Sequence, residues 1–253
     1  MSKLQVKSDN ALAPVSESLE SWGPSPMSSK DLIVSKILPM QMMSKKVIEG
    51  IGVFGDLRDT VNGEKFGDLS TPLEFVPFHM EKVFIESSVI GNKKTYLGQT
   101  PITQANENLP FESVVEGKTI SRDYTINFYC ILPKQVQPEM ASQGGGCLPY
   151  IVSFRRTSLR AGKKVATQAY AANAAMNKPP AATVMTLHAV KTTNDLGTYV
   201  TLDTKAARLS TKEELATAFF WFKAMKAMNL KVDDSDLKEE SNSTTGISET
   251  AEF

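Results

Sequence analysis

Alternation of apolar and polar residues is the dominant pattern of the chain and indicates β structure. Val, Ile, Phe, Tyr and Thr are concentrated where the alternation is strongest, as expected of strands with one buried face. Five runs share the pattern and are predicted as strands: residues 73–87, 125–132, 148–157, 183–192 and 198–205. Residues 194–197 (NDLG) separate the last two runs and predict a hairpin turn.

Two segments change to a helical period. Residues 158–176 are rich in alanine, with Val165, Ala169 and Ala172 at helical spacing, and the run stops before Pro179. The second helix opens with Thr211 and Glu214, the spacing of a capping box. It is assigned to residues 211–230 and is apolar around most of its circumference, so it must pack on the rest of the protein or on a partner.

The order of these elements is three strands, a helix and two strands. This order predicts a mainly β protein with α additions, namely an OB-fold-like five-stranded barrel (β-β-β-α-β-β) followed by a packing helix. The barrel domain is assigned to residues 31–210, with a turn-rich insertion at 88–122. Within it, residues 31–60 combine a Met-rich run with several glycines and are predicted as a short helix followed by a loop. Polar residues 1–30 are predicted as a flexible arm.

Charge is distributed unevenly along the 253 residues, although the net charge is zero. Residues 118–226 hold 15 Lys or Arg against 6 Asp or Glu, whereas residues 233–253 hold 7 acids against one lysine. A basic body therefore precedes an acidic tail. The sequence has no apolar run long enough for a membrane span and no signal-peptide pattern, so a cytoplasmic protein without membrane contact is expected. Cys130 and Cys147 are expected to be reduced thiols.

Basic residues are densest in the segment FRRTSLRAGKK, which contains no acid. Its cations are candidate phosphate ligands, together with two lysines of the last two strands: Arg155, Arg156, Arg160, Lys163, Lys164, Lys191 and Lys205. Aromatic residues of the same strands are candidate stacking platforms for bases: Tyr129, Tyr150, Phe154 and Tyr199. The plain alternatives are a solvated helix face for the cations and core positions for the rings.

The acidic tail, residues 231–253, lacks the apolar content to offset the entropy of ordering and is expected to be disordered. Its last residue is Phe253, the tail's single aromatic. Candidate partner-binding residues are the tail acids and this terminal ring: Asp233, Asp234, Asp236, Glu239, Glu240, Glu249, Glu252 and Phe253.

An OB barrel followed by an acidic tail that ends in Phe resembles the single-stranded DNA-binding proteins of bacteria and bacteriophages, and the phage type is closer. The resemblance covers residues 73–205 and 233–253. It implies a protein of the bacterial host cytoplasm that coats single-stranded DNA in replication, recombination and repair. The tail would recruit a polymerase, helicase-primase or recombinase and compete with DNA for the basic groove. Two departures are Thr250-Ala251, which dilute the acids, and the long N-terminal segment.

Enzymatic functions find little support in the sequence. It contains only two histidines, no metal-ligand spacing, no Walker loop and no nucleophile elbow, so neither catalysis nor a cofactor or metal is expected. The cluster Asp56, Asp59, Glu64 and Asp68 suits a solvated loop better than a Mg²⁺ site. Three alternatives stay open. They are a protein-interaction or virion component, a nucleic-acid enzyme or polymerase accessory factor that uses the Asp56 to Asp68 loop with Mg²⁺, and a homodimer formed through the 211–230 helix.

Overall fold

The strands form one large open sheet in the computed structural model, which describes residues 33–90, 93–115, 117–195, 197–228 and 231–232. The strands, in chain order, are β1 (Ile33–Pro39), β2 (Leu57–Asp59), β3 (Lys65–Gly67), β4 (Leu73–Ile90), β5 (Lys93–Pro101), β6 (Glu112–Val115), β7 (Lys118–Ile131), β8 (Tyr150–Arg155), β9 (Thr183–Asn194), β10 (Gly197–Leu209) and β11 (Lys231–Val232). Their order across the sheet is β10-β9-β4-β7-β8-β1-β2-β3, with β5 beside β4, β6 beside β7 and β11 beside β1.

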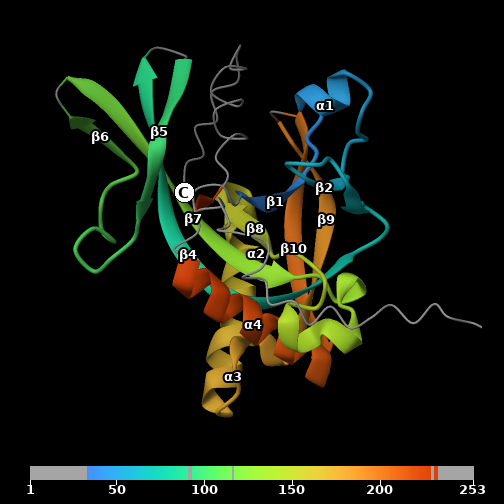
Figure 1. Ribbon diagram of the computed structural model, residues 1–253. Helices are drawn as coiled ribbons and strands as arrows, with labels where there is room; N and C mark the ends of the chain where they lie inside the picture. The colour runs from blue at the N-terminus through green and yellow to red at the C-terminus, as the bar shows by residue number, and fades with distance from the viewer. Residues whose placement is uncertain (1–32, 91–92, 116, 196, 229–230, 233–253) are drawn as a thin grey trace, which may run out of the picture.

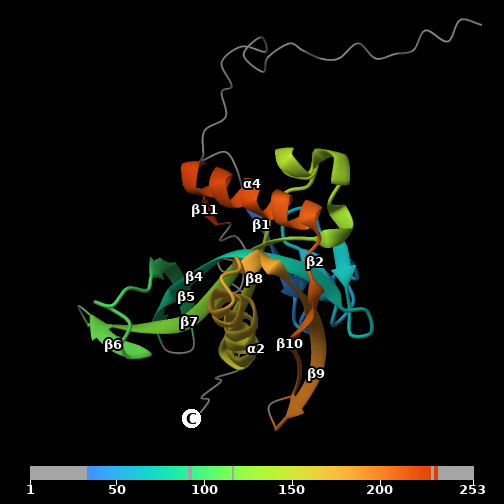
Figure 2. The ribbon, with the colours of Figure 1, turned by 90° about the horizontal axis from the view of Figure 1, so that it is seen from below.

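The α-helices are α1 (Lys45–Ile48), α2 (Leu159–Val165), α3 (Ala172–Ala175) and α4 (Lys212–Met228). Two of them, α2 and α4, cover the two faces of the sheet. A π-helical turn, Ala166–Ala171, joins α2 to α3, so the predicted helix at 158–176 is one helical run. Figure 2 shows α4 on one side of β4, β7 and β8 and α2 on the other.

The predicted OB-fold-like barrel is wrong, because the sheet neither closes nor curls into a barrel. Within the described ranges, each end strand of the sheet, β10 and β3, pairs with only one neighbour. Strand β1 is a strand that the sequence pattern does not predict, since residues 33–39 fall in the segment expected to be a helix and loop. In the structure these residues pair in parallel with β8, from Ser35↔Tyr150 to Ile37↔Val152. The edge of β8 is therefore occupied by β1, and the sheet continues outward through β2 and β3.

The individual elements of the prediction are confirmed better than their assembly. The five predicted strands correspond to β4, β7, β8, β9 and β10, and both predicted helices are present. The 88–122 insertion contains β5 and β6, which flank long extensions of β4 and β7. These four strands form an arm that projects from the body (Figure 1). The tail assignment began two residues early, since Lys231 and Val232 form β11, and the assignments for residues 1–30 and 233–253 lie outside the described residues.

One face of the sheet packs against α2. Alternate residues of the central strands, among them Ile126, Phe128, Val152 and Phe154, form this core, and Val165 enters it from the helix. Close contact depends on Gly162, where an added Cβ would lie 2.7 Å from the Cβ of Phe154. The helix can lie this near to β8 because glycine has no side chain there.

The opposite face packs against α4. The residues that alternate with the first set, including Tyr129, Ile131 and Ile151, form a second core that contains Ala218. Trp221 packs on it and donates a hydrogen bond from its Nε1 to the carbonyl of Gly144, 3.1 Å away. The apolar side of α4 thus packs on the rest of the protein, which is one of the two alternatives that the sequence predicts for this helix.

Replacing Gly162 with alanine tests the close approach of α2 to β8. In an unobstructed helix this substitution stabilises by about 0.8–1.0 kcal/mol, but overpacking a core costs about 1–3 kcal/mol. We expect Gly162→Ala to destabilise the protein by about 1–2 kcal/mol, because the new methyl group meets the buried Phe154. Urea unfolding measures the change, with Thr167→Ala at an exposed position of the same helical run as the control. A Gly162→Ala protein as stable as the wild type would contradict this packing.

Candidate nucleic-acid interface

The basic segment begins at the end of β8 and continues into α2, which is fastened along the open edge of β10. Ser158 Oγ accepts a hydrogen bond from the backbone N–H of Leu202 at 3.0 Å, and Gln168 Oε1 accepts one from the N–H of Ala206 at 3.1 Å. Thr204 Oγ1 donates to the carbonyl of Ala161 at 3.0 Å. These contacts satisfy edge groups of β10 and hold the basic helix in a fixed position.

Two of the predicted phosphate ligands are held by carboxylates of neighbouring strands. The guanidinium of Arg156 lies 2.8 Å from Asp123 Oδ2 on β7, and Arg156 adopts a left-handed conformation with φ of 49°. Lys164 pairs with Asp203 on β10, and this bond lowers the pKa of the Asp203 carboxyl. The helix is therefore connected by ion pairs to the arm at one end and to β10 along its side.

Asp123 is the buried centre of the first connection, with 3 % of its surface exposed. Burial by itself would raise the pKa of this carboxyl, but the charges of Arg156 and Lys94 hold the pKa below its usual value. Lys94 Nζ, from β5, lies 3.3 Å from the same Oδ2 atom. Sequence reasoning missed this junction, because Lys94, Asp123 and Arg156 come together only through the pairing of distant strands.

Arg160 and Lys163 project from the exposed side of α2, one helical turn apart. Neither forms an ion pair with the residues that the structure describes. Arg155, at the end of β8, is half-buried, and its charge also lowers the pKa of Asp123. Of the five cations of the basic segment, Arg156 and Lys164 are thus held by carboxylates, Arg160 and Lys163 face solvent, and Arg155 is half-buried.

The predicted stacking platforms are mostly core residues. Phe154 is fully buried and packs edge-to-face on Phe128, with ring centroids 5.7 Å apart. Tyr129 is 4 % exposed and donates to Glu81 Oε2 at 3.1 Å, while Tyr150 is 7 % exposed and packs on Phe66. These three rings therefore have little surface on which a base could stack, because they lie in the two cores of the sheet. Among the predicted rings only Tyr199 keeps an accessible surface.

The two lysines of the terminal hairpin are exposed but lie on opposite faces of it. Lys191 is opposite Val200, whose side chain enters the core under α2, whereas Lys205 is opposite Thr186 and shares a face with Tyr199 and Asp203. The structure therefore brings Lys205 to the side that holds the Lys164–Asp203 pair. Lys191 lies farther along the hairpin, toward its tip.

The candidate Mg²⁺ loop uses its carboxylates to bind protein cations. Asp56 pairs with Arg58 and Lys65, each at 2.9 Å, and Lys65 also lies 2.8 Å from Asp68. Asp59 Oδ1 accepts the backbone N–H of Val61 at 2.7 Å. In the part of the chain that the structure describes, no group of His, Cys, Asp and Glu residues is arranged to hold a metal ion.

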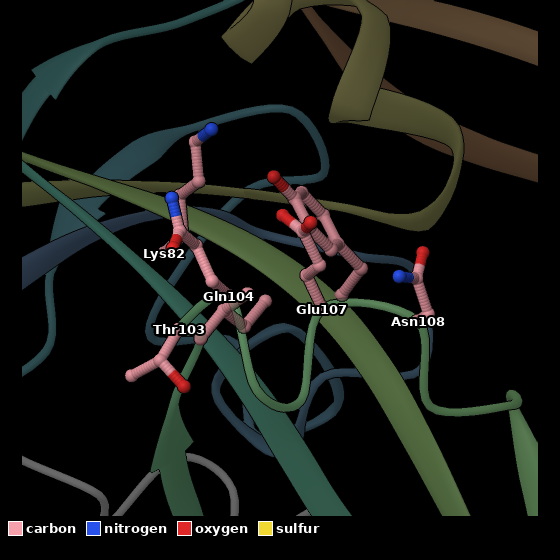
Figure 3. Close-up of a pocket in the computed structure, with 7 residues that line it drawn as sticks. Lys82, Thr103, Gln104, Glu107 and Asn108 are labelled. Carbon is pink, nitrogen blue, oxygen red and sulfur yellow. The ribbon is translucent and has the colours of Figure 1, made fainter.

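A shallow polar hollow of about 480 Å³ lies at the base of the arm (Figure 3). Lys82 and Tyr124 form its floor on the sheet, and Thr103, Gln104 and Glu107 come from the loop after β5. Tyr124 points away from the face that carries Asp123, because consecutive residues of a strand face opposite sides. Tyr124 packs instead against the core that lies under α2, so the hollow is on the face of the sheet that α2 covers.

The predicted tail residues, Asp233 to Phe253, lie outside the described residues. A comparison with protein families matches residues 7–238 to the family described as Pam3 phage gp34-like protein. The chain belongs to this bacteriophage protein family. No curated protein and no solved structure matches it. Among the described helices, none combines the length and the apolar character needed to cross a membrane.

Changing Asp123 to asparagine tests the ionic connection between the arm and α2. Since the pKa of Asp123 is below 3.8 in the folded protein, its charge contributes stability above about pH 4, which is lost as pH falls through the folded-state pKa. We expect Asp123→Asn to cost about 1–3 kcal/mol at neutral pH, and the difference from the wild type to shrink in acid.

Urea unfolding of both proteins across a pH series measures this difference. Asp195→Asn, at the exposed turn of the β9–β10 hairpin, is the matched control that removes one carboxylate without removing these ion pairs. A cost of Asp123→Asn that stays constant as the pH falls would show that the contribution does not come from the charge.

Proposed function

We propose that this phage protein binds single-stranded DNA through the exposed face of α2 and acts in replication, recombination and repair in the cytoplasm of the bacterial host. The observation that carries the proposal is the pair Arg160 and Lys163, which face solvent on α2. Lys164 of the same helix is held by Asp203, and Arg156, which precedes the helix, is held by Asp123. Charges presented on a rigid element lose little conformational freedom when they bind phosphate.

Arg155, Arg156 and Lys164 surround this pair and strengthen the local positive potential. The carboxylate partners of Arg156 and Lys164 reduce what these two cations can offer to DNA, since a phosphate would have to replace Asp123 or Asp203. Arg160 and Lys163 therefore make the main phosphate contacts. The membership in a phage family and the acidic character of residues 233–253 agree with a role in phage DNA metabolism.

Burial of Tyr129, Tyr150 and Phe154 changes the expected mechanism. Stacking on aromatic rings contributes about 1–3 kcal/mol per base in other single-strand binders. In this protein Tyr199 is the one predicted ring left for that role, so binding is mainly electrostatic and strongly salt-dependent. Single-strand preference then arises from the flexibility of the strand, which can follow the curved path from Arg155 along α2 to Lys205.

A protein-interaction or virion role is the second candidate, and a separate feature favours it. The arm carries exposed apolar side chains near its tip, including Ile90, Leu97 and Val114. Clustered exposed apolar residues often mark contacts with other proteins. If the protein does not bind DNA at any salt concentration, low salt included, the protein-interaction or virion role is favoured over DNA binding.

Neutralising the exposed pair tests the DNA-binding proposal. The double variant Arg160→Ala/Lys163→Ala removes two phosphate contacts, so the slope of log K against log salt should become less steep by about 1.4 for a single strand. Fluorescence anisotropy of a labelled oligo-dT of about 30 nucleotides measures binding over a salt series, with duplex DNA as competitor.

The matched control is Lys223→Ala/Lys226→Ala, which removes the same charge from α4 on the opposite side of the sheet. Its ammonium groups lie over the rings of Phe219 and Phe222, each 4.3 Å from the centroid. We expect this variant to keep the wild-type slope. Equal losses in the two variants would place binding elsewhere, and no binding by the wild type at low salt would discard the function.

Deleting residues 233–253 tests the role of the acidic tail. Removal of its seven acids should tighten DNA binding at low salt, because an intramolecular competitor for the cations is lost, and the gain should fade as salt rises. The same anisotropy assay measures the effect, and a pull-down of phage replication proteins measures partner recruitment, which should be lost. Unchanged affinity at low salt would contradict the competition.

A further inference from the structure

The edge strands of the sheet differ in how well their outer backbone groups are protected from pairing with another chain. On β10, the backbone N–H groups of Val200, Leu202 and Ala206 are each covered by a side chain, from Gln41, Ser158 and Gln168 respectively. On β5, the sequence carries two lysines and ends at Pro101, and its pairing with β4 shifts register between Glu86 and Ser87. Such features prevent an edge from pairing with another chain.

Strand β6 lacks these protections. It pairs with β7 and with no other strand in the described part of the chain, and its sequence ESVV contains neither lysine nor proline. Figures 1 and 2 both show it at the outer margin of the arm. Val114, at 73 % exposure, is among the most exposed apolar residues that the structure describes, and Phe111 and Val115 are exposed beside it.

The register fixes which backbone groups of β6 face outward. Arg122 N donates to the carbonyl of Phe111 at 2.7 Å, and Val115 is opposite Lys118 at the turn. Since hydrogen-bonded positions alternate in an antiparallel pair, Ser113 and Val115 bond to β7. The N–H and C=O groups of Glu112 and Val114 therefore point away from the sheet, where a further strand could bind them.

We propose that the occupant of this edge is β6 of a second copy, paired antiparallel about a two-fold axis at Ser113. This register places Val114 opposite Glu112 of the second copy and Phe111 opposite Val115 of the second copy. Glu112 therefore never lies directly opposite Glu112 of the second copy, and two of the three exposed apolar residues, Phe111 and Val115, lie opposite each other. The two arms would form one continuous sheet, an isologous contact.

This dimer is independent of DNA binding and differs from the one first considered for α4, whose apolar side lies against the sheet. A contact made by one short strand and its neighbours is small, so we expect an affinity in the micromolar range. Sedimentation equilibrium of the full chain from about 1 μM to about 200 μM brackets that range.

Substitutions that change the charge of β6 test whether the edge of this strand forms the dimer contact. Val114→Glu places a carboxylate opposite Glu112 of the second copy, twice per dimer, and should weaken association at least about tenfold. Adding Glu112→Lys to Val114→Glu makes both pairs opposite in charge and should restore the dimer. Ile90→Glu, at an equally exposed apolar position of the same arm, is the control and should leave association unchanged.

A cysteine at the axis provides a direct readout. Ser113 would face Ser113 of the second copy at a non-hydrogen-bonded position, where Cα atoms lie about 4.5 Å apart, within disulfide range. Ser113→Cys should give a reducible dimer on oxidation, whereas Thr193→Cys at the exposed β9–β10 hairpin should not. The native Cys130 and Cys147 are buried. A monomer over the whole concentration range, or a dimer that Val114→Glu leaves intact, would overturn the proposal.

Discussion

Burial of both faces of β7 and β8 is the constraint on which the rest of the structure depends. Alternate residues of these strands pack under α2, and the residues between them pack under α4. The central strands consequently present no face to a ligand, and their aromatic rings serve the two cores. Any ligand-binding surface must be built from the covering helices, the hairpin and the arm.

The basic segment that runs from the end of β8 into α2 combines structural and functional charges. Asp123 and Asp203 hold Arg156 and Lys164, so α2 is joined to the arm and to β10, and Arg160 and Lys163 are left on the outer side. The same carboxylates moderate the positive potential of the segment. This arrangement explains why a strongly basic sequence yields a modest exposed charge.

The elements could be predicted from the sequence because their periodicity is local, whereas the assembly depends on long-range pairing. Strand β1 was missed because its short run IVSKILP lies beside a Met-rich, glycine-rich segment that has no alternating pattern. Alternation identified the strands that carry Tyr129 and Phe154 but could not show that both faces of these strands are covered. The basic segment was found directly, while its partners Asp123 and Asp203 follow only from the strand register.

Lysine footprinting by mass spectrometry, with and without an excess of oligo-dT, tests most directly whether DNA lies on α2. Acylation of the exposed amine of Lys163 should be suppressed by DNA, and Lys223 and Lys226 on α4 should react equally in both samples. Full reactivity of Lys163 in the presence of bound DNA, or protection confined to the α4 lysines, would contradict the account.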